Sequence, residues 1–206
     1  MRQRDLPRER LLDAARTFVE SGDWEELRLA PVARAAGVSR QTAYNEFGSR
    51  LGLVRALVDR ELDGFVGGVQ ERMERHVDDV PAAVGAGVLH ALGEAGRRPL
   101  LRGSLGAGRD RDDDLLGLAT RGTDLLLRRL VEAFRAYADA VWPAIPDEAK
   151  NLLVESLMRL TVSHAVAPLH APDEVARGMA ELTRRLLSPH RTGEPDGDPG
   201  GTPDPP

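Results

Sequence analysis

Residues 28–47 read RLAPVARAAGVSRQTAYNEF, and the fold of the N-terminal part of the chain follows from this stretch. Val32, Ala33 and Ala36 recur at helical spacing, and Gly37 then interrupts the apolar pattern. The small side chain of Ala33 lets two helices cross closely, and a glycine enters a left-handed turn without steric cost. The stretch therefore predicts a helix, a tight turn and a second helix.

The second of these helices is predicted to begin after Ser39, a good N-cap residue, and its first two turns are polar. The polar side chains there are Arg40, Gln41, Thr42, Tyr44 and Asn45. Such groups donate hydrogen bonds to phosphates or read base edges, and few of them would help a core. The plainer alternative is an inert helical hairpin, because a helix-turn-helix is also an ordinary packing unit. The run of polar side chains favours nucleic-acid binding.

Residues 32–53, VARAAGVSRQTAYNEFGSRLGL, closely resemble the DNA-binding signature of the TetR family of bacterial transcriptional regulators. In that family a helix-turn-helix is followed by Tyr-x-x-Phe, here Tyr44 and Phe47, and by a basic residue that opens a fourth helix, here Arg50. The resemblance is specific over about residues 10–60 and architectural beyond them. Two positions depart from the family pattern, since Arg28 replaces the usual threonine that opens the second helix and Arg50 replaces the usual lysine.

The resemblance and the side-chain chemistry together predict the DNA contacts. Arg40 suits guanine and Gln41 suits adenine, so we expect these two to read base edges. The resemblance implies that Thr42, Tyr44 and Arg50 position the protein on phosphates. The complete set of predicted DNA-binding residues is Arg28, Ser39, Arg40, Gln41, Thr42, Tyr44, Asn45 and Arg50.

The charge of the chain is unevenly distributed. The net formal charge is −5, but residues 28–60 hold six arginines against Glu46 and Asp59, which makes this segment +4 and the remainder −9. A basic end on an acidic body would approach a polyanion by that end only. Chance variation of charge along the chain is the alternative explanation.

Composition and motifs argue against other classes of protein. The chain has 41% hydrophobic and 30% charged residues and no cysteine, as expected of a globular protein in a reducing compartment, and we expect it to be cytoplasmic. The apolar stretch 80–93 is too short for a membrane span, and the N-terminus lacks a secretory signal. No glycine-rich phosphate loop, HExxH or GxSxG motif occurs, and the histidines do not pair at ligand spacing. We therefore expect no enzyme, no cofactor and no metal site.

Apolar periodicity predicts an all-α protein of about nine helices. An N-terminal three-helix head (residues 1–48, DNA-binding) is followed by a helical body (residues 49–188, ligand-binding and dimerisation) and a disordered Pro- and Gly-rich tail (residues 189–206). Pro7 to about Ser21 forms the first helix, and Trp24 and Leu27 are expected to cover the small core of the head.

The fourth helix is predicted to begin after the cap residue Ser49 and to run for about 28 residues, long enough to join head and body. Gly64, Gly67 and Gly68 lie near its middle, where glycine costs about 1 kcal/mol each relative to alanine. They either allow another helix to approach closely or form a soft joint through which the body moves the head.

Further helices are predicted at 79–95, at about 100–105, from the acidic run 112–114 to Trp142, from a cap at Asp147 to Val166, and from Pro172 onwards. The last two are expected to form an antiparallel hairpin that either completes the core or faces the same pair of a second chain. The resemblance favours the second reading, a four-helix dimer interface. Its predicted residues are Leu153, Leu157, Leu160, His164, Val175, Met179, Leu182 and Leu186.

In proteins of the resembled family the body encloses a small-molecule pocket. The residues predicted to line it here are Phe65, Leu89, His90, Leu92, Leu118, Arg121 and Trp142. The chain is thus interpreted as a homodimeric, ligand-responsive regulator, a repressor on a palindromic double-stranded operator, released by an unknown, largely apolar effector. The alternatives are an activator of the same family and a dimeric helical protein that binds a small molecule without binding DNA.

Overall fold

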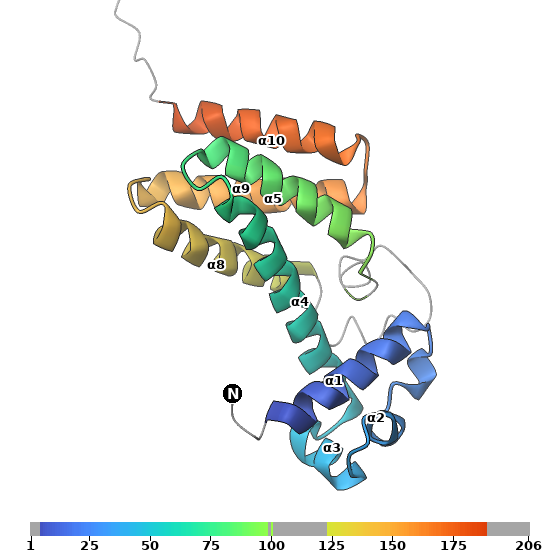
Figure 1. Cartoon of the computed structure of the whole chain (residues 1–206). Helices are drawn as coiled ribbons and strands as arrows, with labels where there is room; N and C mark the ends of the chain where they lie inside the picture. Colours follow the sequence, from blue (N-terminus) through green and yellow to red (C-terminus); the bar gives the residue numbers. More distant parts are fainter. Residues whose placement is uncertain (1–4, 99, 101–122, 189–206) are drawn as a thin grey trace, which may run out of the picture.

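The computed structural model describes residues 5–98, 100 and 123–188, and every regular element in these residues is a helix (Figure 1). The elements are α1 (Asp5–Glu20), the 3₁₀ helix η1 (Trp24–Glu26), α2 (Leu29–Ala35), α3 (Arg40–Phe47), α4 (Arg50–Glu74), α5 (Val80–Ala95), α8 (Thr123–Val141), α9 (Asp147–Val166) and α10 (Pro172–Leu187). The all-α prediction is confirmed. The predicted loop at 106–114, most of the predicted helix at 100–105 and the tail 189–206 lie outside the described residues. Within the described residues, no helix is both long and apolar enough to cross a bilayer.

Capping side chains set the starts of α3 and α4 as predicted. Ser39 and Ser49 each accept a hydrogen bond from the backbone three residues later, at Thr42 and Gly52. The expected cap at Asp147 is wrong. Pro146 holds the N-cap position of α9, so Asp147 lies in the first turn, where its carboxylate accepts from Arg135 and Lys150 instead of from the backbone.

The head is built from α1, α2, α3 and the first part of α4 around one apolar core. Leu27 is fully buried in this core, and Trp24 packs against it, as predicted. Gly37 takes a φ of +63°, the left-handed turn expected between α2 and α3. Leu100, which follows α5, is also buried in the head core, so the chain returns from the body to touch the head.

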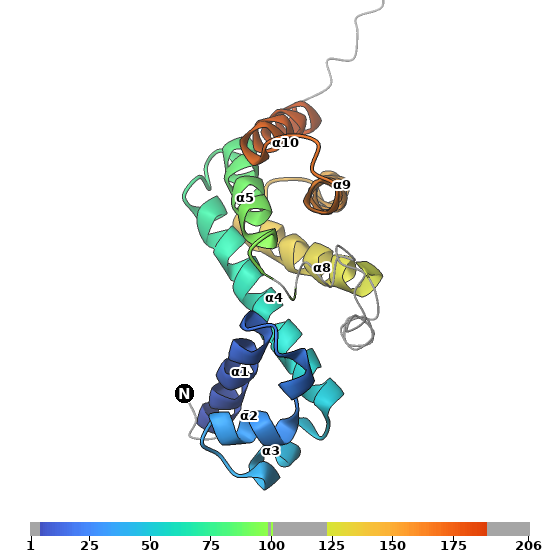
Figure 2. The same cartoon turned by 90° about the vertical axis from the view of Figure 1, so that its right-hand side faces the viewer.

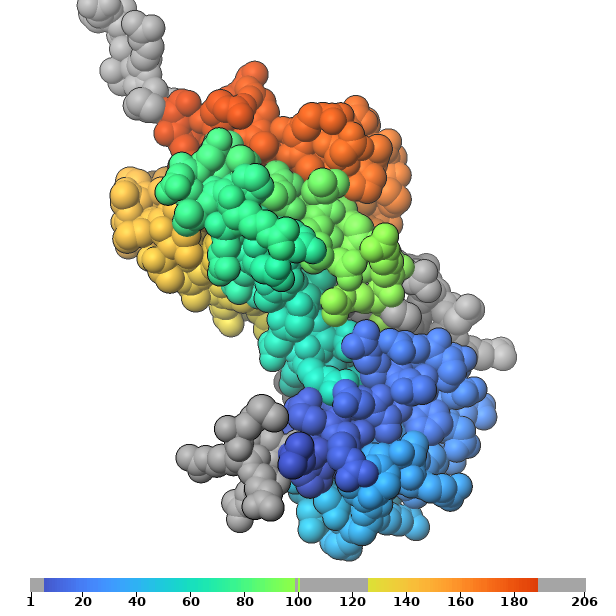
Figure 3. Space-filling model, viewed as in Figure 1, coloured from blue at the N-terminus to red at the C-terminus, as the bar shows by residue number. Residues whose placement is uncertain are grey.

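Helix α4 leaves the head and continues into the body without a break (Figures 1 and 2). It has 25 residues, slightly fewer than expected, because it ends at Glu74. Its first half, with Leu53 and Leu57, belongs to the head core, whereas Leu62 and Val69 belong to a core of the body. Figure 3 shows the head in blue and the body in green to orange as two lobes joined along this helix.

Helix α5 lies between α4 and α10 because its surface is made of small residues. A Cβ atom at Gly87 would lie 2.8 Å from Cγ of Met73 on α4, and one at Gly85 would lie 3.3 Å from Cβ of Ala180 on α10. The close approach at Gly85 accompanies extensive packing of α10 on α5. Helix α10 packs less on α9, its predicted hairpin partner. Helices α8 and α9 complete the body.

Candidate nucleic-acid interface and apolar cavity

The start of α3 is held in place by its own side chains. Oγ of Ser39 accepts a hydrogen bond from the backbone N–H of Thr42 at 3.0 Å and lies 2.8 Å from Oγ1 of Thr42. The backbone N–H of Val38 donates to the carbonyl of Ala33 at 3.0 Å, which closes the turn between the two helices. The N-terminal end of α3 is therefore fixed relative to α2.

Helix α3 turns one apolar side inward and the predicted polar side outward. Ala43 and Phe47 are buried in the head core. The exposed residues are Arg40, Gln41, Tyr44 and Asn45, with Ser39 exposed before them and Thr42 half-buried. The structure thus brings six of the predicted DNA-binding residues together at one end of the molecule.

The exposed side chains of α3 are paired with one another. The guanidinium of Arg40 lies over the ring of Tyr44, 5.6 Å from its centroid, and Nε2 of Gln41 donates to Oδ1 of Asn45 at 2.9 Å. Each pair spans one helical turn, so the four side chains form a surface in which neighbours orient each other. Arg40 and Gln41, whose side chains suit the major-groove edges of guanine and adenine, are presented side by side.

The two remaining predicted DNA-binding residues differ in their surroundings. Arg28 is exposed at the N-cap of α2 and makes no side-chain capping bond. Arg50 is half-buried, and it donates from Nε to the carbonyl of Leu27 at 2.9 Å and from Nη2 to the carbonyl of Trp24 at 2.6 Å. Arg50 therefore ties η1 to the start of α4, a structural task that sequence reasoning missed.

Several arginines of the head keep their charge available for a polyanion. Arg28, Arg34 and Arg40 are exposed and form no ion pair within the described part of the chain. Arg60, by contrast, pairs with Glu9 at 3.3 Å and Asp13 at 2.8 Å. Arg28, Arg34 and Arg40 lie at or within α2 and α3, where the predicted interface is, and on α4 Arg55 is exposed without an ion pair to any described residue whereas Arg60 is paired.

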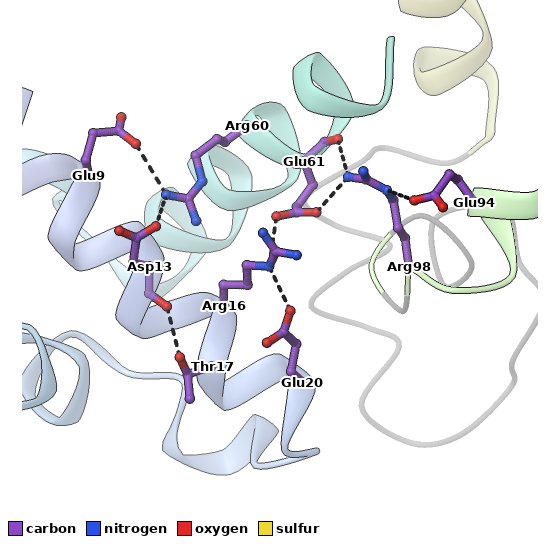
Figure 4. A network of polar contacts seen from close by, with 9 residues as sticks. All are labelled: Glu9, Asp13, Arg16, Thr17, Glu20, Arg60, Glu61, Glu94 and Arg98. Carbon is purple, nitrogen blue, oxygen red and sulfur yellow. Dashed lines mark hydrogen bonds and ion pairs between the residues drawn. The ribbon is translucent and has the colours of Figure 1, made fainter. Parts of the chain in front are cut away.

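A network of ion pairs connects the head to the body (Figure 4). Its centre is Glu61 of α4, which is only 8% exposed. Its Oε1 lies 3.6 Å from Nε of Arg16 on α1, and its Oε2 lies 3.2 Å from Nη1 of Arg98, just after α5. Arg16 also pairs with Glu20 on α1, and Arg98 also pairs with Glu94 on α5. One carboxylate thus joins three segments of the chain.

The body contains an apolar cavity between α4, α5, α8 and α9, with a volume of about 90 Å³. It is lined by Leu62, Phe65, Val69, Met73, Val84, Gly87, Val88, Ala91, Ala95, Leu126, Leu130, Phe134, Ala138, Trp142, Ile145, Lys150, Leu153, Val154, Leu157, Met158, Thr161, Val162 and Ala165. Polar side-chain groups in this wall belong to Lys150, Thr161 and Trp142, and the indole Nε1 of Trp142 donates to the carbonyl of Val77 at 2.8 Å. The wall suits an apolar occupant.

Lys150 is engaged away from this cavity by two carboxylates. Its Nζ donates to Oδ1 of Asp139 at 2.6 Å and lies 3.1 Å from Oδ1 of Asp147. The bond to Asp139 raises the pKa of Lys150 and lowers the pKa of Asp139, because it favours the charged form of each group. Within residues 5–98, 100 and 123–188, no three His, Cys, Asp or Glu side chains gather as a metal ion would require.

Comparison with known proteins identifies the family. Residues 11–57 match the family described as bacterial regulatory proteins, tetR family, and residues 79–185 match the bacterial tetracyclin repressor C-terminal domain. The HTH-type transcriptional regulator AlkX of Mycobacterium tuberculosis is 34% identical over 187 residues, which cover 91% of this chain and 88% of that protein. The chain belongs to the TetR family of bacterial transcriptional regulators.

Solved structures of TetR-family proteins agree with this assignment. The crystal structure of the TetR family repressor AlkX from Dietzia sp. strain DQ12-45-1b, implicated in biodegradation of n-alkanes, superposes with a TM-score of 0.67 at 30% identity. The match covers 87% of this chain and 95% of that one. A TetR-family structure from Mesorhizobium loti has a TM-score of 0.56 at 16% identity, covers 91% of this chain and 98% of that one, and shows the shared fold alone.

The cavity of this TetR-family regulator includes two of the residues predicted to line it, Phe65 and Trp142. Leu89 is 45% exposed, and Leu89, His90 and Leu92 are not among the residues that line this cavity. The periodicity of α5 does not say which of its sides faces α8 and α9, so a ligand contact at these three residues stays a prediction. Leu118 and Arg121 lie outside the described residues.

His90 contacts α4 instead of the cavity. Its Nε2 lies 3.0 Å from where a Cβ atom of Gly68 would be. Burial lowers the pKa of His90, and the charge of Arg72 lowers it further. Gly68 thus fits the packing explanation, whereas Gly67 has open space around it and Gly64 only Arg98, at 4.0 Å.

The eight residues predicted for the dimer interface are divided between core and surface. Leu153, Leu157, Val175 and Met179 are buried in one apolar core with Val84 and Val88 of α5. Leu160 and Leu186 are exposed, and His164 and Leu182 are half-buried. The first four therefore complete the core of the single chain, which was the alternative reading of the hairpin.

Proposed function

We propose that this TetR-family regulator is a homodimeric repressor that binds a palindromic operator and is released by a small, largely apolar molecule. The observation that carries the DNA-binding part is the exposed, mutually oriented polar side of α3. Two heads in one dimer would place their α3 helices in successive major grooves, so half-sites are expected about one helical turn or somewhat more apart.

The roles of the α3 residues follow from their chemistry. Arg40 reads guanine and Gln41 reads adenine, each preorganised by its partner one turn later, Tyr44 or Asn45. Ser39 and Thr42 present hydroxyls near the positive end of α3, and Arg28 adds a charge beside it. Arg50 contributes through the nitrogen that it does not use to hold η1.

Binding to duplex DNA from the flank of the protein's own gene tests these roles, with affinity measured against salt concentration and on single-base operator variants. Gln41→Ala is expected to change which variants are preferred, at about 1–3 kcal/mol for the base that it reads. Arg50→Ala is expected to weaken binding to all sequences. It should also reduce the slope of log affinity against log salt concentration by about the contribution of one phosphate contact.

Arg50→Lys is the matched variant because it keeps the charge and loses the fork that bonds two carbonyls. If Arg50→Lys keeps the full salt dependence of DNA binding, Arg50 contacts a phosphate. If the salt dependence falls in Arg50→Lys, Arg50 has only the structural role of holding η1. Failure of the unaltered protein to bind any duplex at low ionic strength would leave a small-molecule sensor that does not bind DNA.

The second chain of the dimer is proposed to pack on the exposed side of α9. Leu152, Leu160 and Val166 are exposed large apolar residues, and they fall within one side of the helix at 100° per residue. Leu160→Glu is expected to dissociate the dimer in sedimentation experiments at micromolar concentration. Leu89→Glu, at an exposed leucine of α5, is the control that should leave the dimer intact.

The effector part of the proposal rests on the apolar wall of the cavity. The relative from Dietzia, a repressor implicated in biodegradation of n-alkanes, agrees with an apolar effector. An effector releases the protein from DNA only by its different affinity for two arrangements of the heads, a coupling of typically about 1–3 kcal/mol.

A further inference from the structure

Two residues that follow α5 connect the body to the head, in addition to helix α4. Nη1 of Arg98 donates to Oε2 of Glu61 at 3.2 Å and to the backbone carbonyl of Glu61 at 3.5 Å (Figure 4). Leu100 is 3% exposed and belongs to the head core, although it follows a helix of the body. We refer to Arg98 and Leu100 together as the latch.

The latch contacts groups that are shielded from water. Glu61 is only 8% exposed, and its other carboxylate oxygen, Oε1, lies 3.6 Å from Nε of Arg16 on α1. Removal of one of the two cations from so buried a carboxylate is costly, because the negative charge is then poorly compensated. Withdrawal of Leu100 would likewise leave a gap in a filled core. Both contacts of the latch therefore oppose a shift of the end of α5 away from the head.

The latch lies close in the chain to the wall of the apolar cavity. Gly87, Ala91 and Ala95 of α5 line the cavity, and Ala95 precedes Arg98 by three residues and Leu100 by five. Glycine and alanine have no side-chain rotamer that could turn aside for an occupant. An occupant that contacts this side and exceeds the empty space of about 90 Å³ therefore displaces the backbone of α5. Close-packed interiors transmit such a displacement.

We infer that the latch couples the cavity to the head. When an occupant displaces α5, Arg98 leaves Glu61 and Leu100 leaves the head core, so the head becomes free to change its position relative to the body. This route of regulation rests on the proposed function. Coupling between two sites is reciprocal, so DNA bound to the head should change the cavity by the same route.

The two tryptophans of the chain report on the two regions separately. Trp24 packs against the head core and Trp142 against a core of the body. A Trp142→Phe protein therefore reports the unfolding of the head by fluorescence, and a Trp24→Phe protein reports the unfolding of the body. In both proteins the fluorescence change in urea should coincide with the loss of helical circular dichroism, because a head and body joined by the latch unfold as one unit.

Leu100→Ala is expected to separate these two signals. In the Trp142→Phe protein, the midpoint of the Trp24 fluorescence change should fall below that of the circular dichroism change by at least about 0.5 M urea. Leu11→Ala is the matched control, because Leu11 is a fully buried leucine of the same core outside the latch, and it should lower both midpoints together. Coincident signals in Leu100→Ala, or an equal separation in Leu11→Ala, would overturn the inference.

Arg98→Ala tests the charged half of the latch, with Arg97→Ala as its control. Arg97 pairs with Glu94 at 3.3 Å and is largely exposed, and Glu94 is also a partner of Arg98. Arg98→Ala should separate the fluorescence and circular dichroism signals, whereas Arg97→Ala should leave them coincident. The opposite result would show that the pair with Glu61 does not hold the head. Circular dichroism without urea that matches the parent confirms that each variant folds.

Duplex DNA from the flank of the protein's own gene tests transmission in the Trp24→Phe protein. Binding of DNA to the head should change the quenching of Trp142 fluorescence by acrylamide. Arg98→Ala should abolish this change while the variant still binds the duplex. A change that persists in Arg98→Ala, or that is absent when DNA binds the protein with an intact latch, would overturn the inference. If no duplex binds, the proposed function fails, and the unfolding signals still decide whether the latch couples head and body.

Discussion

The head and the body bury their side chains differently. Of the seven large side chains that are fully buried in the described residues, six lie in the head core: Leu11, Leu27, Leu53, Leu57, Val32 and Val54. Apart from Ala83, the buried residues of the body cores keep a few per cent of their surface exposed, and one of these cores surrounds the cavity. The head is therefore packed as a rigid unit that presents α3, whereas the body is packed so that it can adapt to an occupant.

The sharpest test of this contrast compares one leucine from each region. Leu57→Ala in the head should lower the free energy of unfolding by about 3–5 kcal/mol, because it leaves a new cavity in a filled core. Leu153→Ala, in the wall of the existing cavity, should cost about 2–3 kcal/mol, because fewer contacts are lost there. Urea unfolding followed by circular dichroism measures both. Equal losses would remove the distinction between the two cores.

The second test concerns the joint between the two regions. Glu61→Gln should lower the free energy of unfolding by about 1–2 kcal/mol, since it removes the charge that Arg16 and Arg98 share. The loss is below that of a fully buried pair because the two arginine side chains are 52% and 26% exposed.

Glu20→Gln is the matched control for this test. Glu20 pairs with the same Arg16 at 2.8 Å but lies on the surface, so its substitution should change stability by less than about 0.5 kcal/mol. Hydrogen exchange in α1 and at the end of α5 should rise only in Glu61→Gln. The same response in both variants would make the network an ordinary surface cluster.

The smallest expected difference in stability is between substitutions at two neighbouring glycines of α4, Gly67 and Gly68. Gly67→Ala should stabilise the protein by up to about 1 kcal/mol, because its Cβ atom would meet open space in a regular helix. Gly68→Ala should gain less or lose stability, because its Cβ atom would lie 3.0 Å from Nε2 of His90. Thermal unfolding compares them. If both alanines stabilise equally, close packing does not explain Gly68.

The same pair of variants also decides between the two explanations of these glycines. A soft joint in α4 predicts that Gly67→Ala weakens the response of DNA binding to an effector, even though no side chain packs there. If the response is unchanged in Gly67→Ala, flexibility at this position has no role in the coupling.

Local patterns in the chain were enough for the head. Gly37, Ser39 and Ser49 act through their own backbone neighbours, so their turns and caps could be predicted from adjacent residues alone. The exposed polar side of α3 was predictable for the same reason, since a charged or amide side chain at a surface needs no distant partner.

Contacts between distant segments were not predictable in this way. Glu61 resembles any acidic residue of an amphipathic helix until Arg16 and Arg98, 45 and 37 positions away, are brought beside it. In the same way, the apolar pattern of α9 and α10 was compatible with a dimer interface, and only the packing of α5 against them placed Leu153 and Val175 in the core of the single chain.

The sequence by itself thus determined the all-helical architecture and the polar surface of α3, because periodicity, caps and turns depend on residues within one or two helical turns of each other. The tertiary structure alone decided which sides of α5, α9 and α10 are buried and where the cavity lies. An apolar side chain is buried equally well against any complementary surface, so the choice of surface depends on how the helices pack together.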